Sequence, residues 1–268
     1  MKKKIIWAFV IAVSVVILGG AYAIFASFNG SLIARAITTK KAKDYVAEKF
    51  PGEPYEVSFA LYDFKWGGYF AQVQSTESED THFIVTDRGD EMWDDFERSV
   101  DGRQNTVYRL YRELDERLEA VLKEKFPHNV SLSYVDSLPD TEEADYKKLE
   151  LDMELNPSTF PIKSGLVVWT ETTGNEPTWE ELAERYRELY GVVKEEFPFI
   201  TKISLSIQYP YEIGKDGELQ DSRPGSFVCA FDVPVEIIET DELEAHLEKV
   251  REEQEAEEAA IQAGEYMK

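Results

Sequence analysis

Two short acidic segments come closest to a metal site in residue type and spacing. Carboxylates crowd the stretches TDRGDEMWDD (86–95) and KDGELQD (215–221), and such oxygen ligands suit calcium. Neither segment matches the twelve-residue calcium loop with its closing glutamate. Both combine Asp with Gly in the way that is typical of tight turns, so turns are the favoured interpretation. The metal candidates are Asp87, Asp90, Asp94, Asp216 and Glu218.

Other groups that could do chemistry are few and scattered. His82, His128 and His246 show no ligand-like spacing to one another or to Cys229, the single cysteine. Cys229 lies in the apolar run FVCAF (227–231), where a buried and inert thiol is expected. The chain holds no Gly-x-Ser-x-Gly motif to fix a nucleophilic serine. We therefore expect no enzyme activity and no cofactor, and the alternative is a metal-assisted hydrolase or cation-binding protein using the acidic turns.

Aromatic side chains crowd a predicted hairpin between residues 55 and 70. Strand alternation directs Phe59 to one face and Tyr62 and Phe64 to the other, so part of the set faces away from the first core. That outer group either meets the second domain or forms a binding surface. The candidate interaction surface consists of Tyr62, Phe64, Trp66 and Phe70.

A repeated pattern of helix, Phe-Pro and strand must position these residues. The helix-forming segments end at Phe50-Pro51, Phe126-Pro127 and Phe197-Pro198. Each proline removes a backbone donor and restricts the residue before it, so the helix stops there. Apolar spacing predicts helices over 107–122 and 179–193 ahead of the second and third stops.

Alternation of apolar and polar residues predicts half-buried strands after each stop and in four further places. The predicted strands run over 57–61, 69–73, 130–134, 149–155, 166–169, 203–209 and 227–233. The loops between strands are too short for parallel crossovers, so antiparallel pairing is expected. The predicted fold class is α+β, with an N-terminal transmembrane helix followed by two domains of antiparallel sheet with helices packed on one face.

Turn-forming residues over 99–105 (SVDGRQN) mark the predicted boundary between the two domains. Two alternatives explain the repeated pattern: duplication of one unit, or convergence of unrelated segments on the same helix stop. The predicted ranges are 1–28 for a cytoplasmic stub and transmembrane anchor, 29–37 for a stalk, 38–100 for the first α+β domain, 101–240 for the second α+β domain, and 241–268 for an acidic C-terminal helix and tail.

Residues 5–28 form the predicted membrane anchor. This segment of 24 residues lacks Asp, Glu, Lys, Arg and His, and as a helix it measures about 36 Å against a hydrocarbon core of about 30 Å. A cleaved signal peptide is the alternative, but its apolar core normally runs to only about 7 to 15 residues. Basic residues flank the segment on both sides. A short basic tail before a long apolar span favours a cytoplasmic N-terminus and an extracytoplasmic body.

The body after this segment is strongly acidic. The chain carries 53 Asp and Glu residues against 29 Lys and Arg, a formal net charge of −24. Such a charge repels the phosphates of nucleic acids, so nucleic-acid binding is excluded. Solubility near a membrane is the favoured reason for the acidity, and attraction to cations or basic partners is the alternative.

Two segments carry a resemblance to a known family. After a basic start and a long apolar run, KKAKDYVAEKFP (40–51) leads to LYDFKWGGYFA (61–71). In this arrangement the chain resembles the YfjL-like proteins of Gram-positive bacteria, most clearly over residues 1–100. The resemblance implies a membrane-anchored α+β protein and no particular reaction. The first domain is also similar in plan to PepSY-type domains, through a helix followed by a hairpin with a turn at 86–90.

The expected function follows from the anchor and the absence of a catalytic motif. We expect a single-pass membrane protein that holds an extracytoplasmic binding or regulatory module at the cell envelope. Its expected partners are the lipid bilayer, through residues 5–28, and an envelope protein.

Overall fold

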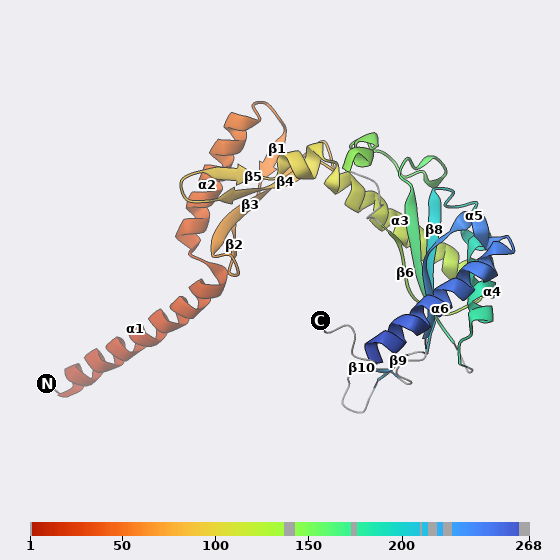
Figure 1. Ribbon diagram of the computed structural model, residues 1–268. Coiled ribbons are helices and arrows are strands. Elements are labelled where there is room, and N and C mark those ends of the chain that lie inside the picture. The colour runs from red at the N-terminus through yellow and green to blue at the C-terminus, as the bar shows by residue number, and fades with distance from the viewer. Residues whose placement is uncertain are drawn as a thin grey trace. The chain divides into compact units, whose positions relative to one another are not determined.

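The computed structural model describes residues 2–136, 143–172, 176–209, 211–213, 219–221 and 227–262. The fold is α+β, as predicted, because a long apolar N-terminal helix precedes two larger sheets with packed helices (Figure 1). The chain divides into two compact units. Unit 1 comprises residues 1–106 and 150–152, and unit 2 comprises residues 107–149 and 153–268.

Helix α1 (Lys2–Asn29) is the long apolar helix that the sequence predicts. Its large apolar side chains, among them Trp7, Ile17 and Phe28, are exposed. In the described part of the chain, one helical stretch near the N-terminus is long and apolar enough to cross a membrane, and it begins within α1. Such a helix is typical of a signal sequence or a membrane anchor.

Gly30 separates α1 from α2 (Leu32–Lys49). Its N–H donates to the carbonyl of Ala26 at 2.8 Å, and its φ of +70° is the left-handed conformation that favours glycine. Ser31 then caps α2 by accepting a hydrogen bond from the N–H of Ala34. The segment predicted as a stalk thus contains this break and the first turn of α2.

Unit 1 is built on an antiparallel five-stranded sheet. Neighbouring strands pair in the order β1, β3, β4, β5, and β2 also pairs with β3. The strands are β1 (Tyr55–Val57), β2 (Leu61–Asp63), β3 (Gly68–Ser75), β4 (His82–Asp87) and β5 (Met92–Asp94), and the π-helical turn η1 (Glu97–Asp101) follows them.

Helix α2 packs on one face of this sheet. Ala42 and Val46, four residues apart on one side of the helix, are buried together with Ala71, Val73 and Val85 of the sheet. Alternation along β3 and β4 therefore directs every second side chain toward α2 and the others away from it.

The first Phe-Pro stop also contributes to the core of unit 1. The N–H of Phe50 donates to the carbonyl of Val46 at 2.9 Å, which closes the last turn of α2. The ring centroid of Phe50 lies 4.8 Å from that of Phe96 and 5.2 Å from that of Phe83. The residue that ends the helix thus joins it to the sheet through aromatic contacts.

The predicted strand over 57–61 is wrong, because the chain breaks between β1 and β2. Ala60 is fully buried at this break. Its N–H donates to Oγ1 of Thr39 at 2.9 Å, and its carbonyl accepts from Nε of Arg35 at 2.6 Å. Side chains of α2 therefore bind the backbone groups that a neighbouring strand would otherwise pair.

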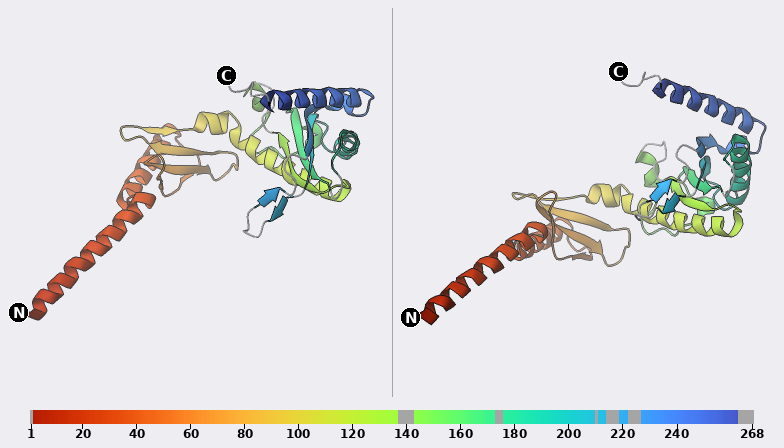
Figure 2. Two further views of the ribbon diagram at one scale, coloured as in Figure 1. Left: turned by 60° about the horizontal axis from the view of Figure 1, so that its bottom comes forward. Right: turned by 90° about the horizontal axis from the view of Figure 1, so that it is seen from below.

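Unit 2 is built on a four-stranded sheet in the order β11, β8, β7, β6. Its strands are β6 (Val130–Asp136), β7 (Ser164–Glu171), β8 (Ile200–Gln208) and β11 (Phe227–Pro234), and β9 (Tyr211–Ile213) pairs separately with β10 (Leu219–Asp221). The helices are α3 (Gln104–Lys125), α4 (Trp179–Val193), α5 (Val235–Ile238) and α6 (Glu242–Gln262), with 3₁₀ turns η2 (Glu143–Lys148) and η3 (Pro157–Thr159). Helix α6 packs beside α4 (Figure 2).

Strands β7 and β8 run parallel, so the expectation of purely antiparallel sheets is wrong for unit 2. Helix α4 connects them and itself supplies the length that a parallel crossover needs. This helix confirms the prediction over 179–193. Thr178 caps it by accepting a hydrogen bond from the N–H of Glu181 at 3.1 Å.

The core of unit 2 lies between its helices and its sheet. Leu110, Leu114 and Leu118 recur every four residues of α3 and are fully buried, together with Leu205 and Ile207 of β8. Each such side chain stabilises the fold by roughly 1.5 to 3 kcal/mol relative to exposure. The helix predicted over 107–122 is therefore confirmed.

The strand predicted over 149–155 is wrong. Leu149 is buried in the core of unit 2, whereas Leu151 packs against the core of unit 1. Asp152 has a φ of +58°, which interrupts extended backbone. Its N–H donates to Oδ2 of Asp80 at 2.8 Å, and the N–H of Asp80 donates to Oδ1 of Asp152 at 2.9 Å. The alternating apolar residues thus serve two cores instead of one sheet face.

Candidate functional site

The carboxylates of Asp87 and Asp94 bind lysines of α2. Oδ2 of Asp87 lies 3.0 Å from Nζ of Lys41, and Oδ2 of Asp94 lies 2.6 Å from Nζ of Lys49. Tyr45 also donates to Asp94 at 2.7 Å. Both aspartates stand at the ends of their strands, β4 and β5, so they hold α2 against the sheet at two points.

Hydrogen bonds keep both carboxyl groups ionised. Burial alone would raise the pKa of Asp87, but hydrogen bonds from Lys41 and Gly89 outweigh it and hold the pKa below its usual value. Burial likewise opposes ionisation of Asp94, and the hydrogen bond from Lys49 is the main contribution that lowers its pKa. The oxygen atoms that could bind a cation are therefore engaged by donors of the protein itself.

The remaining metal candidates lie elsewhere. Asp90 is exposed in the turn that joins β4 to β5, where the N–H of Arg88 donates to the carbonyl of Glu91 at 3.0 Å. Asp216 and Glu218 lie outside the described residues. Within the residues that the structure describes, no group of three or more His, Cys, Asp or Glu side chains is placed to hold a metal ion.

The histidines and the cysteine belong to different parts of the fold. His82 is on β4, His128 follows α3, and His246 is on α6. Nε2 of His128 lies 2.5 Å from a carboxylate oxygen of Glu188. Cys229 is buried, and burial raises the pKa of its thiol, which keeps it in the unreactive protonated form.

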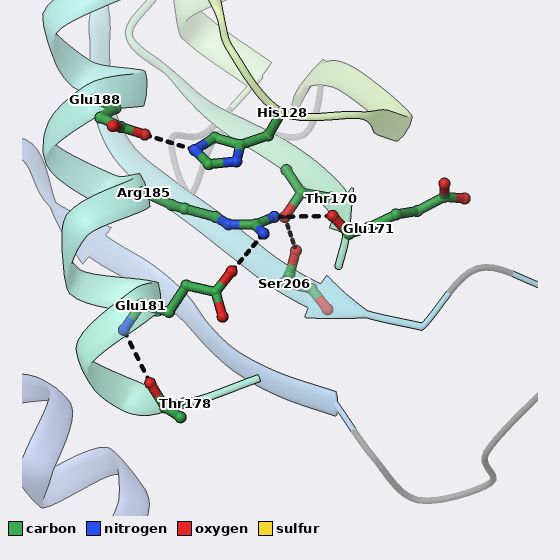
Figure 3. Close-up of polar contacts among 8 residues, drawn as sticks. All are labelled: His128, Thr170, Glu171, Thr178, Glu181, Arg185, Glu188 and Ser206. Carbon is green, nitrogen blue, oxygen red and sulfur yellow. Dashed lines mark hydrogen bonds and ion pairs between the residues drawn. The ribbon is translucent and has the colours of Figure 1, made fainter. Parts of the chain in front are cut away.

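A buried arginine in unit 2 joins α4 to the carboxyl ends of the parallel strands (Figure 3). The Arg185 side chain is 5% exposed, and its Nη2 lies 2.5 Å from Oε1 of Glu181. Its Nη1 donates to Oγ1 of Thr170 at 2.6 Å, and Thr170 donates in turn to the carbonyl of Ser206 at 2.9 Å. Ligands often bind at this end of parallel strands. Here the charge of the guanidinium is already balanced by Glu181, so the cluster fixes α4 on the sheet.

The sequence gives one signal for this cluster, the spacing of four residues between Glu181 and Arg185. That spacing is common on exposed helices and does not reveal burial. The cluster depends on β7 and β8 lying side by side, which the sequence analysis did not predict.

Tyr62 and Tyr69, opposite each other on β2 and β3, lie at the junction of α1 and α2. Their ring centroids are 4.9 Å apart, and the hydroxyl of Tyr69 accepts from the N–H of Ser31 at 3.0 Å. A Cβ placed on Gly30 would lie 2.7 Å from Cβ of Tyr62, so the backbone of Gly30 packs directly on this side chain. Tyr62 therefore supports the end of the apolar helix.

Apolar side chains form a row across the sheet of unit 1 on the face turned away from α2. Leu61 pairs with Phe70, Phe70 with Thr86, and Thr86 with Trp93. Ile84 stands on the same face of β4, two residues before Thr86. Leu61, Ile84 and Trp93 are each at least 36% exposed, and Phe70 is half-buried. We call Leu61, Phe70, Ile84 and Trp93 the outer sheet face.

Arg88 orders one end of the outer sheet face. Its guanidinium carbon lies 4.6 Å from the centroid of the Trp93 ring, within the range of a cation–π contact. The outer sheet face therefore ends in an exposed arginine and tryptophan that lie against each other.

Phe64 and Trp66 occupy the turn between β2 and β3, beside the last residues of α1 (Figure 1). The ring centroid of Phe64 lies 6.1 Å from that of Phe28. Both phenylalanines are exposed, and Trp66 is 87% exposed. The four predicted surface residues thus separate into three places: Phe64 and Trp66 in this turn, Phe70 on the outer sheet face, and Tyr62 at the helix junction.

Comparison with known families identifies both units. The YfjL-like N-terminal domain matches residues 1–95, and the YfjL-like C-terminal domain matches residues 113–248, about half of the chain. The chain belongs to the YfjL-like family. The resemblance seen in the sequence is thereby confirmed. No curated protein and no solved structure matches this YfjL-like chain.

Each of the features described above lies within one of the two YfjL-like domains. The N-terminal match contains the apolar helix, the aromatic turn and the outer sheet face. The C-terminal match contains the buried Arg185 cluster. Sequence reasoning missed Trp93 as a surface residue of the YfjL-like chain, because its place on the sheet depends on strand β5, which was not predicted.

Proposed function

We propose that this YfjL-like chain is a single-pass membrane protein whose acidic body lies outside the cytoplasm and acts as a binding or regulatory module without catalytic activity. The outer sheet face supports the proposal, because apolar side chains grouped across four strands and largely exposed are typical of protein interaction sites. Helix α1, exposed and apolar, supports the membrane location.

The composition of the outer sheet face favours a protein partner. Trp93 and Arg88 belong to the residue types that contribute most to binding energy in protein interfaces. Their contact orders both side chains before binding, which lowers the entropy cost of association. We therefore propose an envelope protein as the partner of this face.

Site-specific photocrosslinking in intact cells tests the binding surface. A photoreactive amino acid at position 93 should capture a specific envelope protein, whereas the same group at position 48 should not. Glu48 is the matched control, since it is exposed on α2 away from the outer sheet face. Recovery of the same bulk envelope proteins from both positions would contradict the proposal.

Protease treatment of whole cells tests the orientation. The short basic N-terminus before the apolar segment 5–28 favours translocation of the body, so protease added outside should digest unit 1 and unit 2. A cytoplasmic marker protein must survive in the same sample. Complete protection of the acidic body would place it in the cytoplasm and overturn the proposed topology.

A further inference from the structure

We propose that the turn between β2 and β3 inserts Phe64 and Trp66 into the interfacial region of the membrane that α1 crosses. This inference rests on the proposed membrane anchoring and adds a second point of contact between unit 1 and the lipid. The turn comprises residues 63–68, and we call it the aromatic turn.

The position of the aromatic turn next to the end of the apolar helix supports a lipid partner. Phe28 is the last apolar residue of the predicted anchor, and its ring lies 6.1 Å from the ring of Phe64. A bilayer that surrounds α1 as far as Phe28 therefore reaches Phe64 as well. The exposed apolar surface of the turn is continuous with that of the helix.

The turn is built to hold its aromatic residues outward. Oδ1 of Asp63 accepts hydrogen bonds from the N–H of Lys65 at 2.8 Å and from the N–H of Trp66 at 3.3 Å. The N–H of Gly67, with a φ of +68°, donates to the carbonyl of Asp63 at 2.8 Å. These bonds fix the backbone while Trp66 remains 87% exposed. The exposed apolar surface of a tryptophan is unfavourable in water, and burial in lipid would remove this cost.

The spacing of aromatic residues matches the thickness of a bilayer. Trp7 and Phe28 are 21 positions apart on α1, which corresponds to about 32 Å along the helix axis. A hydrocarbon core is about 30 Å thick, and tryptophan concentrates at both of its interfaces. Trp7 thus lies at one interface when Phe28 reaches the other, and Trp66 joins Phe28 at that second interface.

The charge of the turn also suits the headgroup region. Lys65 is exposed between Phe64 and Trp66, so its ammonium group lies at the level where lipid phosphates are found.

A second contact with the membrane stops unit 1 from rotating freely around the axis of α1. The direction of the outer sheet face relative to the membrane then becomes fixed.

Quenching of tryptophan fluorescence by brominated lipids tests the inference. The full chain is reconstituted in vesicles of phosphatidylcholine, a zwitterionic lipid, with bromine on the upper acyl carbons. Both Trp7 and Trp66 should then be quenched, so Trp7→Phe should keep about half of the wild-type quenching. Trp66→Phe should keep a similar part, and the double variant should lose nearly all of it.

The control variant and the contrary results separate this inference from the proposed function. Trp93→Phe removes an exposed tryptophan of the outer sheet face and should leave the quenching unchanged. If Trp7→Phe alone abolishes quenching, the anchor is in the bilayer but the aromatic turn is not, and only this inference is overturned. If the wild-type chain is not quenched at all, the proposed anchoring fails together with the inference.

Discussion

Lys49 and Asp94 join the last turn of α2 to strand β5. Nζ of Lys49 lies 2.6 Å from Oδ2 of Asp94, whose side chain is 4% exposed. Tyr45, one helical turn earlier, donates to the same oxygen at 2.7 Å. Two donors of one helix thus converge on a single buried carboxylate, and this contact fixes the helix that precedes the sheet of unit 1.

Asp94→Asn should destabilise the packing of α2 by about 1 to 2 kcal/mol, because the substitution leaves Lys49 without its buried counter-charge. Hydrogen exchange of the α2 amides in the full chain measures the effect. Asp44→Asn is the matched control, since Asp44 forms an exposed ion pair with Lys40 within the same helix. Equal acceleration of exchange in both variants would contradict the assigned role.

The same contact predicts a dependence of stability on pH. The folded protein lowers the pKa of Asp94, so folding favours the ionised form. The stabilisation is complete above the pKa of an unfolded aspartate, about 3.9, and is lost as the pH falls through the lower folded value. Urea denaturation of unit 1 between about pH 5 and pH 3 should show this loss. Asp94→Asn should flatten the dependence of the unfolding free energy on pH. An unchanged slope in this variant would argue against a contribution from Asp94.

Gly30→Ala should destabilise unit 1 more than the same change at Gly52. Both glycines have a positive φ, so both substitutions strain the backbone by about 1 kcal/mol. Only at Gly30 would the new methyl group lie 2.7 Å from Tyr62, which raises the expected loss to about 1 to 3 kcal/mol. Denaturation of the two variants side by side measures the difference. Equal losses would show that Tyr62 does not determine the junction.

Tyr186→Phe should destabilise unit 2 by about 1 to 2 kcal/mol. The Tyr186 hydroxyl is fully buried, donates to the carbonyl of Ala230 at 2.7 Å and accepts from the N–H of Leu205 at 3.1 Å. Its loss leaves two buried backbone groups on β8 and β11 without this partner. Faster hydrogen exchange of these strands is the expected result. Tyr134→Phe, at an exposed position of β6, should have little effect.

Calorimetric titration with calcium, magnesium and zinc should detect no stoichiometric binding at the turn between β4 and β5. Asp87 is occupied by Lys41, and Asp94 by Lys49. Lys41→Met and Lys49→Met together free these carboxylates and provide the comparison. Tight binding to the wild-type chain that Asp87→Asn abolishes would instead favour the metal-assisted hydrolase.

Features set by local residue patterns could be predicted from the sequence. Helices α3 and α4 follow from apolar spacing, and each ends near a Phe-Pro stop. Strand alternation also predicts that part of the aromatic hairpin faces away from the core, as Phe70 does, although Tyr62 lies on the opposite face from Phe70. These predictions depend on residues within a few positions of each other.

Features set by the choice of partner strand could not be predicted. The parallel pairing of β7 with β8 and the row from Leu61 to Trp93 depend on register between distant segments. The same holds for the engagement of Asp87, because nothing near it in the sequence indicates that Lys41 lies beside it. The contact of Tyr62 with Gly30 could not be predicted for a similar reason, since Gly30 lies between α1 and α2, far from Tyr62 in the sequence.

Unit 1 is completed by residues that the ribosome makes after α3 and β6. The backbone of Asp80 bonds to Asp152, and Leu151 fills part of the core of unit 1. A nascent chain that has emerged only as far as Thr106 therefore contains α2 and all five strands of the sheet but lacks the segment that completes them. Synthesis from the N-terminus makes this unit first but finishes it only when Asp152 follows. A gene fragment that ends at Thr106 thus encodes an incomplete unit.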